Sequence, residues 1–318
     1  MAIDSKELEA TMPATELDWT EDAKSRMLNV PFFVRKSVVR GIETFAKEKN
    51  IELIDDDFVS RARQEREGDA IAKMQADKKA KAEANGGKAT RRQFVNFAFY
   101  KLDPAFRRLP DEERDQGKRE FLSLLEEYDG SDDMILLSYS TMGLRTDAEL
   151  MLWRISYKLE DFQAMSTKMF RTGLGKYLTP TYSYFSQTKR SMYMDTFNPE
   201  HEEDRTHIIP GKAKYLFIYP FTKKREWYLL SQHARQGIMD EHIYIGNQYP
   251  SVKLNTTYSF GLDDNEFVVA FESDYPDDFL DLVMDLRETE GSKYTENDIP
   301  IFTCVAMALE DAVNSLGI

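Results

Sequence analysis

The sequence predicts an α+β protein in which two ferredoxin-like repeats form a β-barrel with outer helices, preceded by a small all-α domain. A strand, helix, strand, strand, helix, strand pattern occurs twice in the C-terminal part of the chain, whereas helical spacing alone occurs before it. A polar segment separates the two regions. With 318 residues, 42% of them hydrophobic, the chain can form more than one domain with a core.

The first domain is predicted over residues 16–62, after an unstructured tail over residues 1–15. A helix is expected to break at Pro31 and resume over residues 33–46, because proline interrupts a helix. The run Asp55 to Asp57 offers an N-cap for a last short helix. The apolar residues before the proline recur at helical spacing, namely Trp19, Ala23, Met27 and Val30.

The segment over residues 63–91 is predicted to be a linker. It is rich in Ala, Lys, Glu and Gln, its largest apolar residues are Ile71 and Met74, and it ends in a run with two glycines. Such a segment cannot bury a core face, so we expect a solvated helix or a tether.

The barrel domain is predicted over residues 92–318. The first repeat has strands over 94–99, 135–141 and 150–155, with helices opened by Pro110 and over 159–170. The second has strands over 215–219, 252–260, 266–272 and 301–306, with helices over 231–245 and opened by Pro276. Each repeat leaves one sheet face uncovered by helices. We therefore expect the two uncovered faces to enclose a barrel interior that can hold a flat ligand.

Charge and cysteine usage narrow the class of protein. A net charge of −14 argues against general nucleic-acid binding, which needs clustered Lys and Arg. The single cysteine, Cys304, allows no intrachain disulfide and reads as a small buried hydrophobe. No stretch approaches the roughly 20 apolar residues of a membrane span. We expect a soluble protein in a reducing, cytoplasmic setting.

One of the four histidines, His242, lies on an apolar helix face. It shares that face with Ile238 and Ile245 at helical spacing. A histidine in such a place is commonly a core residue whose ring bonds to a backbone carbonyl. It can also serve as an axial ligand to haem iron.

Several motifs are spread along the barrel domain, over about residues 92–318. They are Asp103-Pro104-Ala105-Phe106-Arg107-Arg108-Leu109-Pro110, Glu149-Leu150-Met151-Leu152-Trp153-Arg154, Tyr219-Pro220-Phe221, Glu226-Trp227-Tyr228-Leu229-Leu230, His242, Tyr258-Ser259-Phe260-Gly261-Leu262-Asp263-Asp264 and Asp285-Leu286-Arg287 ahead of Thr289, Glu290 and Tyr294. With these motifs the domain resembles the chlorite dismutase superfamily, and within it the coproheme decarboxylases.

The resemblance implies roles around an iron tetrapyrrole. His242 matches the proximal iron ligand, and Glu290, or failing that Glu288, matches the carboxylate that accepts from the second ring nitrogen. Tyr219 matches the tyrosine that is oxidised beside a propionate, and Trp227 matches a proximal-side tryptophan. Without the resemblance to the family, the sequence would predict that the two glutamates face solvent and that the two aromatic residues belong to the hydrophobic core.

Three further positions follow from the same resemblance. His207 resembles a distal acid/base for peroxide, although its separation from Tyr219 is shorter than in the matching subgroup. Lys223 matches a basic residue near a propionate, with Lys224 as an equal chemical alternative to it. Leu254 occupies the place where chlorite-splitting members carry an arginine. Without a guanidinium to hold the anion, efficient chlorite dismutation is not expected.

The implied reaction is peroxide-dependent decarboxylation of iron coproporphyrin III, as both substrate and cofactor, to haem b. A haem peroxidase with weak chlorite activity and a non-catalytic tetrapyrrole-binding or sensing protein remain alternatives. Family members assemble as homo-oligomeric rings, usually pentamers.

The first domain resembles the small C-terminal domain of light-independent protochlorophyllide reductase subunits. The resemblance rests on Asn29-Val30-Pro31-Phe32-Phe33-Val34-Arg35 and on Glu43, Ala46, Ile54 and Asp56. It implies either a second site for tetrapyrroles or a packing and docking module. No catalytic residue in it can be named.

Overall fold

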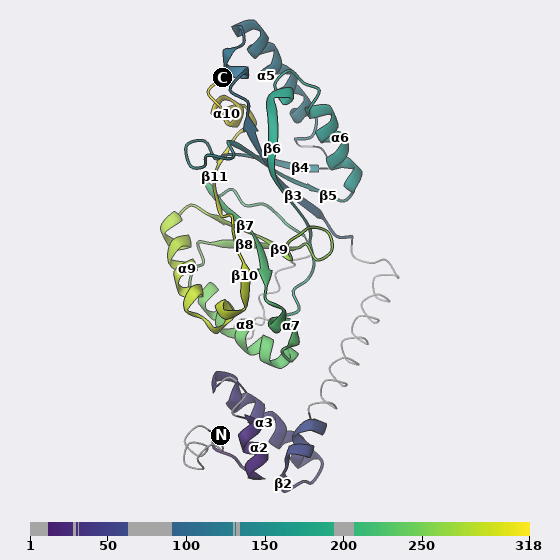
Figure 1. Cartoon of the computed structure of the whole chain (residues 1–318), viewed down its shortest axis with the longest axis vertical. Helices are drawn as coiled ribbons and strands as arrows, with labels where there is room; N and C mark the ends of the chain where they lie inside the picture. The colour runs from purple at the N-terminus through teal and green to yellow at the C-terminus, as the bar shows by residue number, and fades with distance from the viewer. Residues whose placement is uncertain are drawn as a thin grey trace. The chain divides into compact units, whose positions relative to one another are not determined.

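The computed structural model describes residues 12–27, 30, 32–62, 91–129, 131, 134–193 and 207–318. Its residues fall into two compact units, one made of the residues before 91 with Leu230–Met239, the other of Arg91–Leu229 with Asp240–Ile318 (Figure 1). Except for residues 12–15 and 91, the predicted tail and linker lie outside the described residues.

The N-terminal part is mainly helical, as predicted, but it also contains a short pair of strands. Its helices are α2 (Glu21–Met27), α3 (Phe32–Glu48) and residues 56–62. The strands β1 (Asp18–Trp19) and β2 (Leu53–Ile54) pair in parallel. The predicted cap is present, because the Phe58 amide donates to Asp55 Oδ1 at 2.7 Å. Two-residue strands are too short to show alternation, which is why the sequence predicted helices alone.

The helical part has a core of its own around one buried carboxylate. Glu43 Oε1 accepts from the Glu16 amide at 2.8 Å, the Leu17 amide at 3.1 Å and Trp19 Nε1 at 3.2 Å. These bonds hold the segment before β1 against α3. The apolar residues around it are Trp19, Ala23, Met27, Val39, Ile42, Phe45, Ala46, Ile54, Phe58, Val59 and Ala62.

The remaining strands form a closed barrel of two ferredoxin-like halves, as predicted. The first half has the strand order β6-β3-β5-β4 and the second β11-β7-β9-β8, with β10 (Thr295–Asn297) added beside β7. Pairing of β4 with β11 and of β6 with β8 joins the halves. The strand bounds are β3 Phe94–Leu102, β4 Met134–Ser140, β5 Leu150–Ser156, β6 Leu178–Gln187, β7 Tyr215–Lys223, β8 Lys253–Tyr258, β9 Phe267–Ser273 and β11 Phe302–Met307.

Strand β6 is the element that sequence patterning does not single out. It contains Pro180, which cannot donate to a ladder hydrogen bond, and its residues are mostly half-buried or exposed. The structure accommodates the proline at an irregularity, where the register against β3 shifts between Phe99 and Tyr100. The fourth strand of the first repeat is therefore present despite a sequence that disfavours it.

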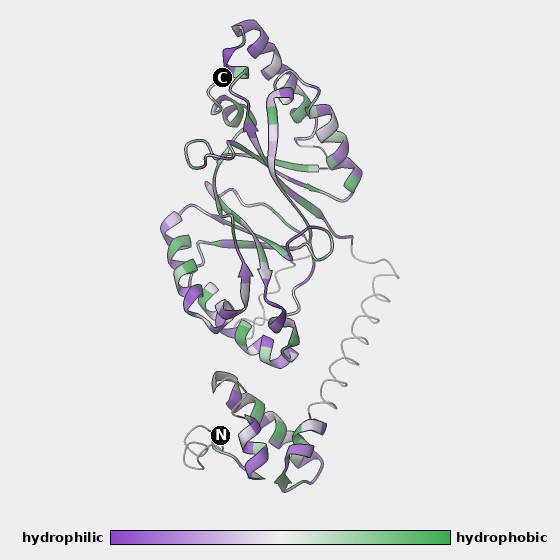
Figure 2. Cartoon of the chain, in the orientation of Figure 1, coloured by the Kyte–Doolittle hydropathy of each residue, from purple (hydrophilic) through white to green (hydrophobic). Residues whose placement is uncertain are grey.

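Helices cover the outer face of each half (Figure 1). Over the first half lie α5 (Asp111–Glu126), α6 (Leu159–Met169) and α10 (Leu309–Asn314). The second half contains α7 (Arg225–Leu229) and α8 (Gln232–Gly246) between β7 and β8, and α9 (Pro276–Glu288) after β9. Hydrophobic and hydrophilic residues alternate along α9, as expected for a helix with one buried face (Figure 2). Short 3₁₀ turns are η1 (Phe106–Arg108), η2 (Gly175–Tyr177) and η3 (Glu290–Tyr294).

In the part of the chain that the structure describes, side chains from both halves fill the barrel interior, so the ligand space predicted there is absent. Leu216 and Ile218 from β7 meet Phe97 and Trp153 from the first half, and each is at most 1% exposed. Cys304 is fully buried there, as expected of a small hydrophobe. The side chains of the two uncovered sheet faces thus pack against each other, and the described residues leave no room for a macrocycle between them.

Among the described helices, none is both long and apolar enough to cross a bilayer.

Candidate functional site

Three of the predicted site residues, Tyr219, Lys223 and Leu254, lie on the side of the second half where its sheet faces the helices. Tyr219 lies on the face of β7 that carries Phe217, and strand alternation puts Lys223 on the same face. Leu254 of β8 pairs with Phe271 of β9 and belongs to the same apolar cluster as Tyr219. The site therefore lies between sheet and helices, outside the barrel interior.

Helix α8 brings His242 to this face. Ile245, one turn further along α8, packs in the cluster that contains Tyr219 and Leu254. His242 is half-buried and shares the helix face with Ile245 and with the fully buried Ile238. Helical spacing thus places His242 on the same side of α8 as Ile245, which packs against the sheet.

Packing on this outer face is much looser than on the equivalent face of the first half. Among the described residues, eighteen buried apolar side chains fill the first cluster. The second has four, namely Phe217, Phe271, Phe279 and Leu282, and nine that stay half-buried: Tyr215, Tyr219, Ile245, Tyr249, Val252, Leu254, Val269, Val283 and Leu286. The two repeats therefore differ in how tightly their helices pack against the sheet. The second half keeps accessible apolar surface of the kind that lines ligand sites.

Tyr219 lies within this loosely packed face. Its ring stacks on Phe271 with centroids 6.0 Å apart and planes at 22°. Burial, with a further effect from Asp298, raises the pKa of its phenol. Among the described residues, no side chain accepts a hydrogen bond from that phenol. The partners left for this hydroxyl are therefore water or a ligand atom.

Lys223 is a cation surrounded by aromatic faces. Its Nζ lies 4.3 Å from the Trp227 ring centroid and 5.2 Å from that of Phe221. Burial lowers the pKa of Lys223 to about 8, partly offset by the charge of Glu266. Within the described residues, no carboxylate oxygen lies within 4.0 Å of this ammonium group. Such a desolvated cation is suited to an anionic ligand.

Trp227 is positioned by short helix α7 and is 2% exposed. Its ring centroid lies 5.4 Å from that of Tyr294 and 6.3 Å from that of Tyr193. Strand β7, helix α7 and turn η3 therefore meet at this indole.

Glu266 is a buried carboxylate to which the sequence analysis gave no role. It is 7% exposed, and its Oε2 accepts from the Lys223 amide at 2.9 Å and from the Tyr228 phenol. Arg225 Nη1 lies 3.8 Å from its Oε1. Glu266 follows Asp263 and Asp264, so the sequence reads as an exposed acidic loop. The inward position of the carboxylate is seen from its bonds to the Lys223 amide and the Tyr228 phenol, and from the Glu266 amide, which donates to the Phe221 carbonyl at the end of the pairing of β7 with β9.

Glu290 lies beside α8. Its amide donates to Glu241 Oε2 at 3.0 Å, and Glu241 directly precedes His242. The Glu290 carboxylate itself bonds Lys293 at 2.9 Å and is 23% exposed. The alternative residue, Glu288, is exposed at the end of α9. The backbone position thus favours Glu290 of the two.

His207 is tied to the first half of the barrel. Its ring centroid lies 6.4 Å from that of Tyr157, and the amide of the next residue, Ile208, donates to Gln93 Oε1 at 2.5 Å. Residues 194–206, directly before it, are outside the described part of the chain. The distal role of His207 stays a prediction.

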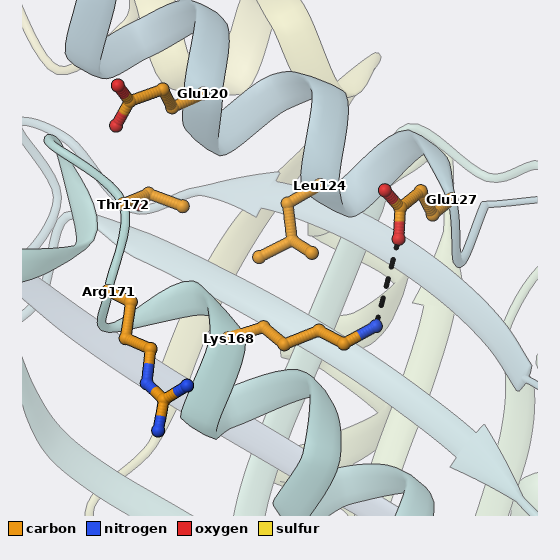
Figure 3. A pocket seen from close by; sticks show the side chains of 6 residues that line it. All are labelled: Glu120, Leu124, Glu127, Lys168, Arg171 and Thr172. Carbon is orange, nitrogen blue, oxygen red and sulfur yellow. Dashed lines mark ion pairs between the residues drawn. The ribbon is translucent and has the colours of Figure 1, made fainter.

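A pocket of about 370 Å³ lies elsewhere, between α5 and α6 (Figure 3). Lys168 Nζ lies 3.8 Å from Glu127 Oε2, and Glu120 accepts from the Gly173 amide at 2.8 Å. These charges are satisfied by local partners, and none of the predicted site residues lines the pocket. It is not the candidate site.

The fold and site define a class of protein: a closed α+β barrel of two ferredoxin-like repeats whose second repeat presents a loosely packed helical face. The chain belongs to the chlorite dismutase family, whose model matches residues 114–307. Residues 19–63 match the family model described as the proto-chlorophyllide reductase 57 kD subunit. Both resemblances seen in the sequence are confirmed.

Individual relatives and structures agree with this assignment. The chain is 30% identical over 184 residues to a coproheme decarboxylase of Mycolicibacterium smegmatis, covering 56% of this chain and 75% of that protein. It is also 30% identical over 209 residues to a coproheme decarboxylase of Staphylococcus carnosus, covering 60% and 82%.

Two solved structures share the fold over 71% of this chain and 95% of their own chains. A mutant chlorite dismutase from Candidatus Nitrospira defluvii superposes with a TM-score of 0.65 at 27% identity. A haem-binding protein from Thermus thermophilus superposes with a TM-score of 0.62 at 25% identity.

Proposed function

We propose that this chain is a haem-dependent enzyme that converts iron coproporphyrin III to haem b with hydrogen peroxide. The observation that carries the proposal is the pair Tyr219 and Lys223 on one face of β7. Among the described residues, the Tyr219 phenol has no side-chain proton acceptor and the Lys223 ammonium group has no carboxylate partner, and both lie beside half-buried apolar side chains. A tetrapyrrole with carboxylate side chains supplies what both groups lack. The coproheme decarboxylases among the relatives support the same substrate class.

The residues present fit such a group. His242 would hold the iron through one ring nitrogen, with Glu290 or a backbone carbonyl accepting from the other. Leu254, Ile245 and Phe271 offer apolar surface to a flat macrocycle. Lys223 would pair with a propionate, and the half-buried setting strengthens that interaction.

The iron tetrapyrrole with peroxide supplies the oxidising equivalents when bound. Each propionate that becomes a vinyl group releases CO₂, one proton and two electrons. Tyr219 passes on electrons one at a time, and its phenolic proton moves to a carboxylate of the substrate, since none of the described side chains accepts a hydrogen bond from it. Lys223 would hold another propionate of the substrate in position. His207 is proposed as the acid/base for peroxide.

The test uses the full chain loaded with iron coproporphyrin III and titrated with peroxide, with products separated by chromatography. Haem b is the expected product. Tyr219→Phe should bind the substrate with unchanged affinity and lose conversion, while Tyr275→Phe, at a tyrosine 61% exposed outside the site, should convert normally. Normal conversion by Tyr219→Phe would refute the assigned electron route.

Two other outcomes would identify the alternative functions. Rapid oxygen release from chlorite would indicate a chlorite-active enzyme and contradict the role given to Leu254. Tight binding of haem b through His242, with bleaching as the only effect of peroxide, would indicate a tetrapyrrole-binding or sensing protein.

The domain division and assembly are part of the same proposal. Residues 16–62 would form a module for docking or for handling tetrapyrroles, linked by residues 63–91 to the haem domain over 92–318. The haem domains would assemble as a homo-oligomeric ring, as in the family. Light scattering of the full chain tests the assembly.

A further inference from the structure

Tyr228 and Glu266 form a phenol–carboxylate pair at the border of the site. The Tyr228 hydroxyl donates to Glu266 Oε2, and burial together with this bond raises the pKa of the phenol. Oxidation of a phenol near neutral pH requires that its proton leave with the electron. A base already in hydrogen-bond contact removes the need for the proton to reach water.

The position of Glu266 is fixed by the fold. Its own amide donates to the Phe221 carbonyl, and its carbonyl accepts from the Ser259 amide at 2.8 Å. The carboxylate is 7% exposed and accepts the Lys223 amide at 2.9 Å, so it cannot swing away from Tyr228 into solvent. The Tyr228 ring is half-buried and packs edge-on against Phe260, with centroids 5.9 Å apart.

An oxidisable neighbour adjoins this pair. Trp227 directly precedes Tyr228 and lies in a group of aromatic rings with Tyr294 and Tyr193. An indole can lose an electron and keep its proton for a short time. Oxidation of a tyrosine with a fixed base beside it is then more favourable than oxidation of the indole, so the tyrosine should reduce the oxidised indole.

Two other tyrosine–carboxylate pairs lack either a carboxylate that can act as a base or a neighbouring tryptophan. Tyr182 donates to Asp147 at 2.6 Å, but Arg145 already binds that carboxylate through two nitrogen atoms and weakens it as a base. Tyr249 donates to Asp285 at 2.6 Å, and no ring contact connects it to a tryptophan within the described residues. Tyr219 has no protein acceptor among those residues.

We propose that Tyr228, with Glu266 as its proton acceptor, is a second oxidisable site that takes up an oxidising equivalent when no substrate carboxylate is present beside Tyr219. Tyr228 loses one electron to an oxidised Trp227 or to another one-electron oxidant, which is thereby reduced. The phenolic O–H bond breaks and its proton moves to Glu266 Oε2. The products are a neutral tyrosyl radical and a protonated carboxyl group. The relation to Tyr219 rests on the proposed function, whereas the chemistry of the pair does not.

The experiment uses the full chain without any tetrapyrrole. A photogenerated ruthenium(III) polypyridyl complex serves as the one-electron oxidant, and transient absorption follows indolyl and tyrosyl radicals. With 16 tyrosines in the chain, variants are needed to locate the radical. In the wild type, indolyl decay should be matched by growth of a tyrosyl signal.

Three variants should separate the roles of Tyr228 as the oxidised residue and Glu266 as its base from oxidation of other tyrosines. Tyr228→Phe should remove most of the rapidly formed tyrosyl radical and prolong the indolyl signal. Glu266→Gln keeps a hydrogen-bond acceptor but not a base, so it should slow tyrosyl formation by roughly tenfold or more. Tyr182→Phe, which removes a phenol from the arginine-bound carboxylate, should leave both the yield and the rate unchanged.

An unchanged tyrosyl yield and rate in Tyr228→Phe, or an equal loss in Tyr182→Phe, would overturn the proposal. If Tyr228→Phe fails to fold, a fluorinated tyrosine at position 228 retains the hydrogen bond and marks the radical by its fluorine coupling in electron paramagnetic resonance. Absence of that coupling would also overturn it. Because no tetrapyrrole is present, these results are independent of whether Tyr219→Phe abolishes decarboxylation.

Discussion

The Lys223 ammonium group lies 4.3 Å from the centre of the Trp227 ring, in the part of the site where β7 meets α7. The indole face stabilises the cation, but it supplies no counter-charge. The result is a positive group that is costly to bury and is kept accessible to an anion. In the role proposed for Lys223, ligand binding and stability therefore oppose each other.

Lys223→Met is expected to stabilise the protein and to weaken binding of carboxylated tetrapyrroles. Removing a desolvated cation should raise the free energy of unfolding at pH 7 by on the order of 1–2 kcal/mol. Loss of a charge-assisted contact should weaken binding of iron coproporphyrin III about tenfold or more. Thermal unfolding and optical titration measure the two effects.

The matched control is Lys224→Met, at the neighbouring exposed lysine. Lys224→Met should change neither the free energy of unfolding nor the affinity for iron coproporphyrin III. Weaker binding in this variant instead would show that Lys224 is the residue that holds the propionate.

The pH dependence of stability gives a second check on Lys223. Because folding lowers the pKa of Lys223 from 10.5 to about 8, the unfolded chain binds more protons between these values. The contribution of Lys223 to stability should rise with pH over that window, and Lys223→Met should abolish this rise.

His242→Ala is expected to abolish iron-dependent binding and to spare binding of the metal-free macrocycle. The axial bond is made to the iron, whereas apolar contacts and Lys223 act on the porphyrin and its carboxylates. Affinity for iron coproporphyrin III should fall by roughly a hundredfold or more, and added imidazole should restore the iron absorption bands.

His233→Ala is the control for this experiment, because His233 is an exposed histidine of the same helix. Its affinity and spectrum should match the wild type. Equal loss of metal-free porphyrin in His242→Ala would show that His242 is a packing residue.

Periodicity and motif resemblance predicted most of the architecture, because each repeat carries strong local signals. The strands around Phe97 and Ile218 alternate or run apolar, and the helices at Asp111 and Pro276 begin at residues that favour helix starts. Strand β6 was not singled out because Pro180 argues against a strand until the irregularity opposite Phe99 is seen.

The location of the site could not be derived from periodicity. Alternation shows that Tyr219 and Ile218 lie on opposite faces of β7, but not which face has room. That depends on how two sheets pack against each other and how far α8 and α9 approach, which are long-range properties. The burial of Glu266 was missed for the same reason.

Asp147→Asn is expected to destabilise the barrel by about 1–2 kcal/mol at neutral pH and to have little effect in acid. Arg145 binds Asp147 and also donates to the Ile301 carbonyl at 3.0 Å, so the pair joins the two halves. The Arg145 guanidinium holds the pKa of Asp147 well below its usual range. The stabilisation is therefore present above the unfolded pKa, near 4, and is lost as pH falls through the folded value.

Denaturant unfolding at several pH values measures this effect. Asp111→Asn provides the comparison, because Asp111 pairs with Arg114 while its side chain is 90% exposed. That exposed pair should contribute little at any pH. A difference between Asp147→Asn and wild type that persists at the lowest pH would contradict the ionic origin of the effect.

Leu254→Arg tests why the wild-type site should not favour chlorite. Leu254 is half-buried on β8 and packs in the cluster with Tyr219, so an arginine there would extend its guanidinium along the face assigned to the ligand. The added charge should cost about 1–3 kcal/mol of stability, because it enters an apolar cluster. In haem-loaded protein it should raise oxygen release from chlorite by roughly tenfold or more over a low wild-type rate. The control is Thr256→Arg, which places a guanidinium group two residues further along β8 on the same face. It should not raise oxygen release from chlorite. Brisk oxygen release by the wild type, or an equal gain in Thr256→Arg, would show that anion handling does not depend on position 254.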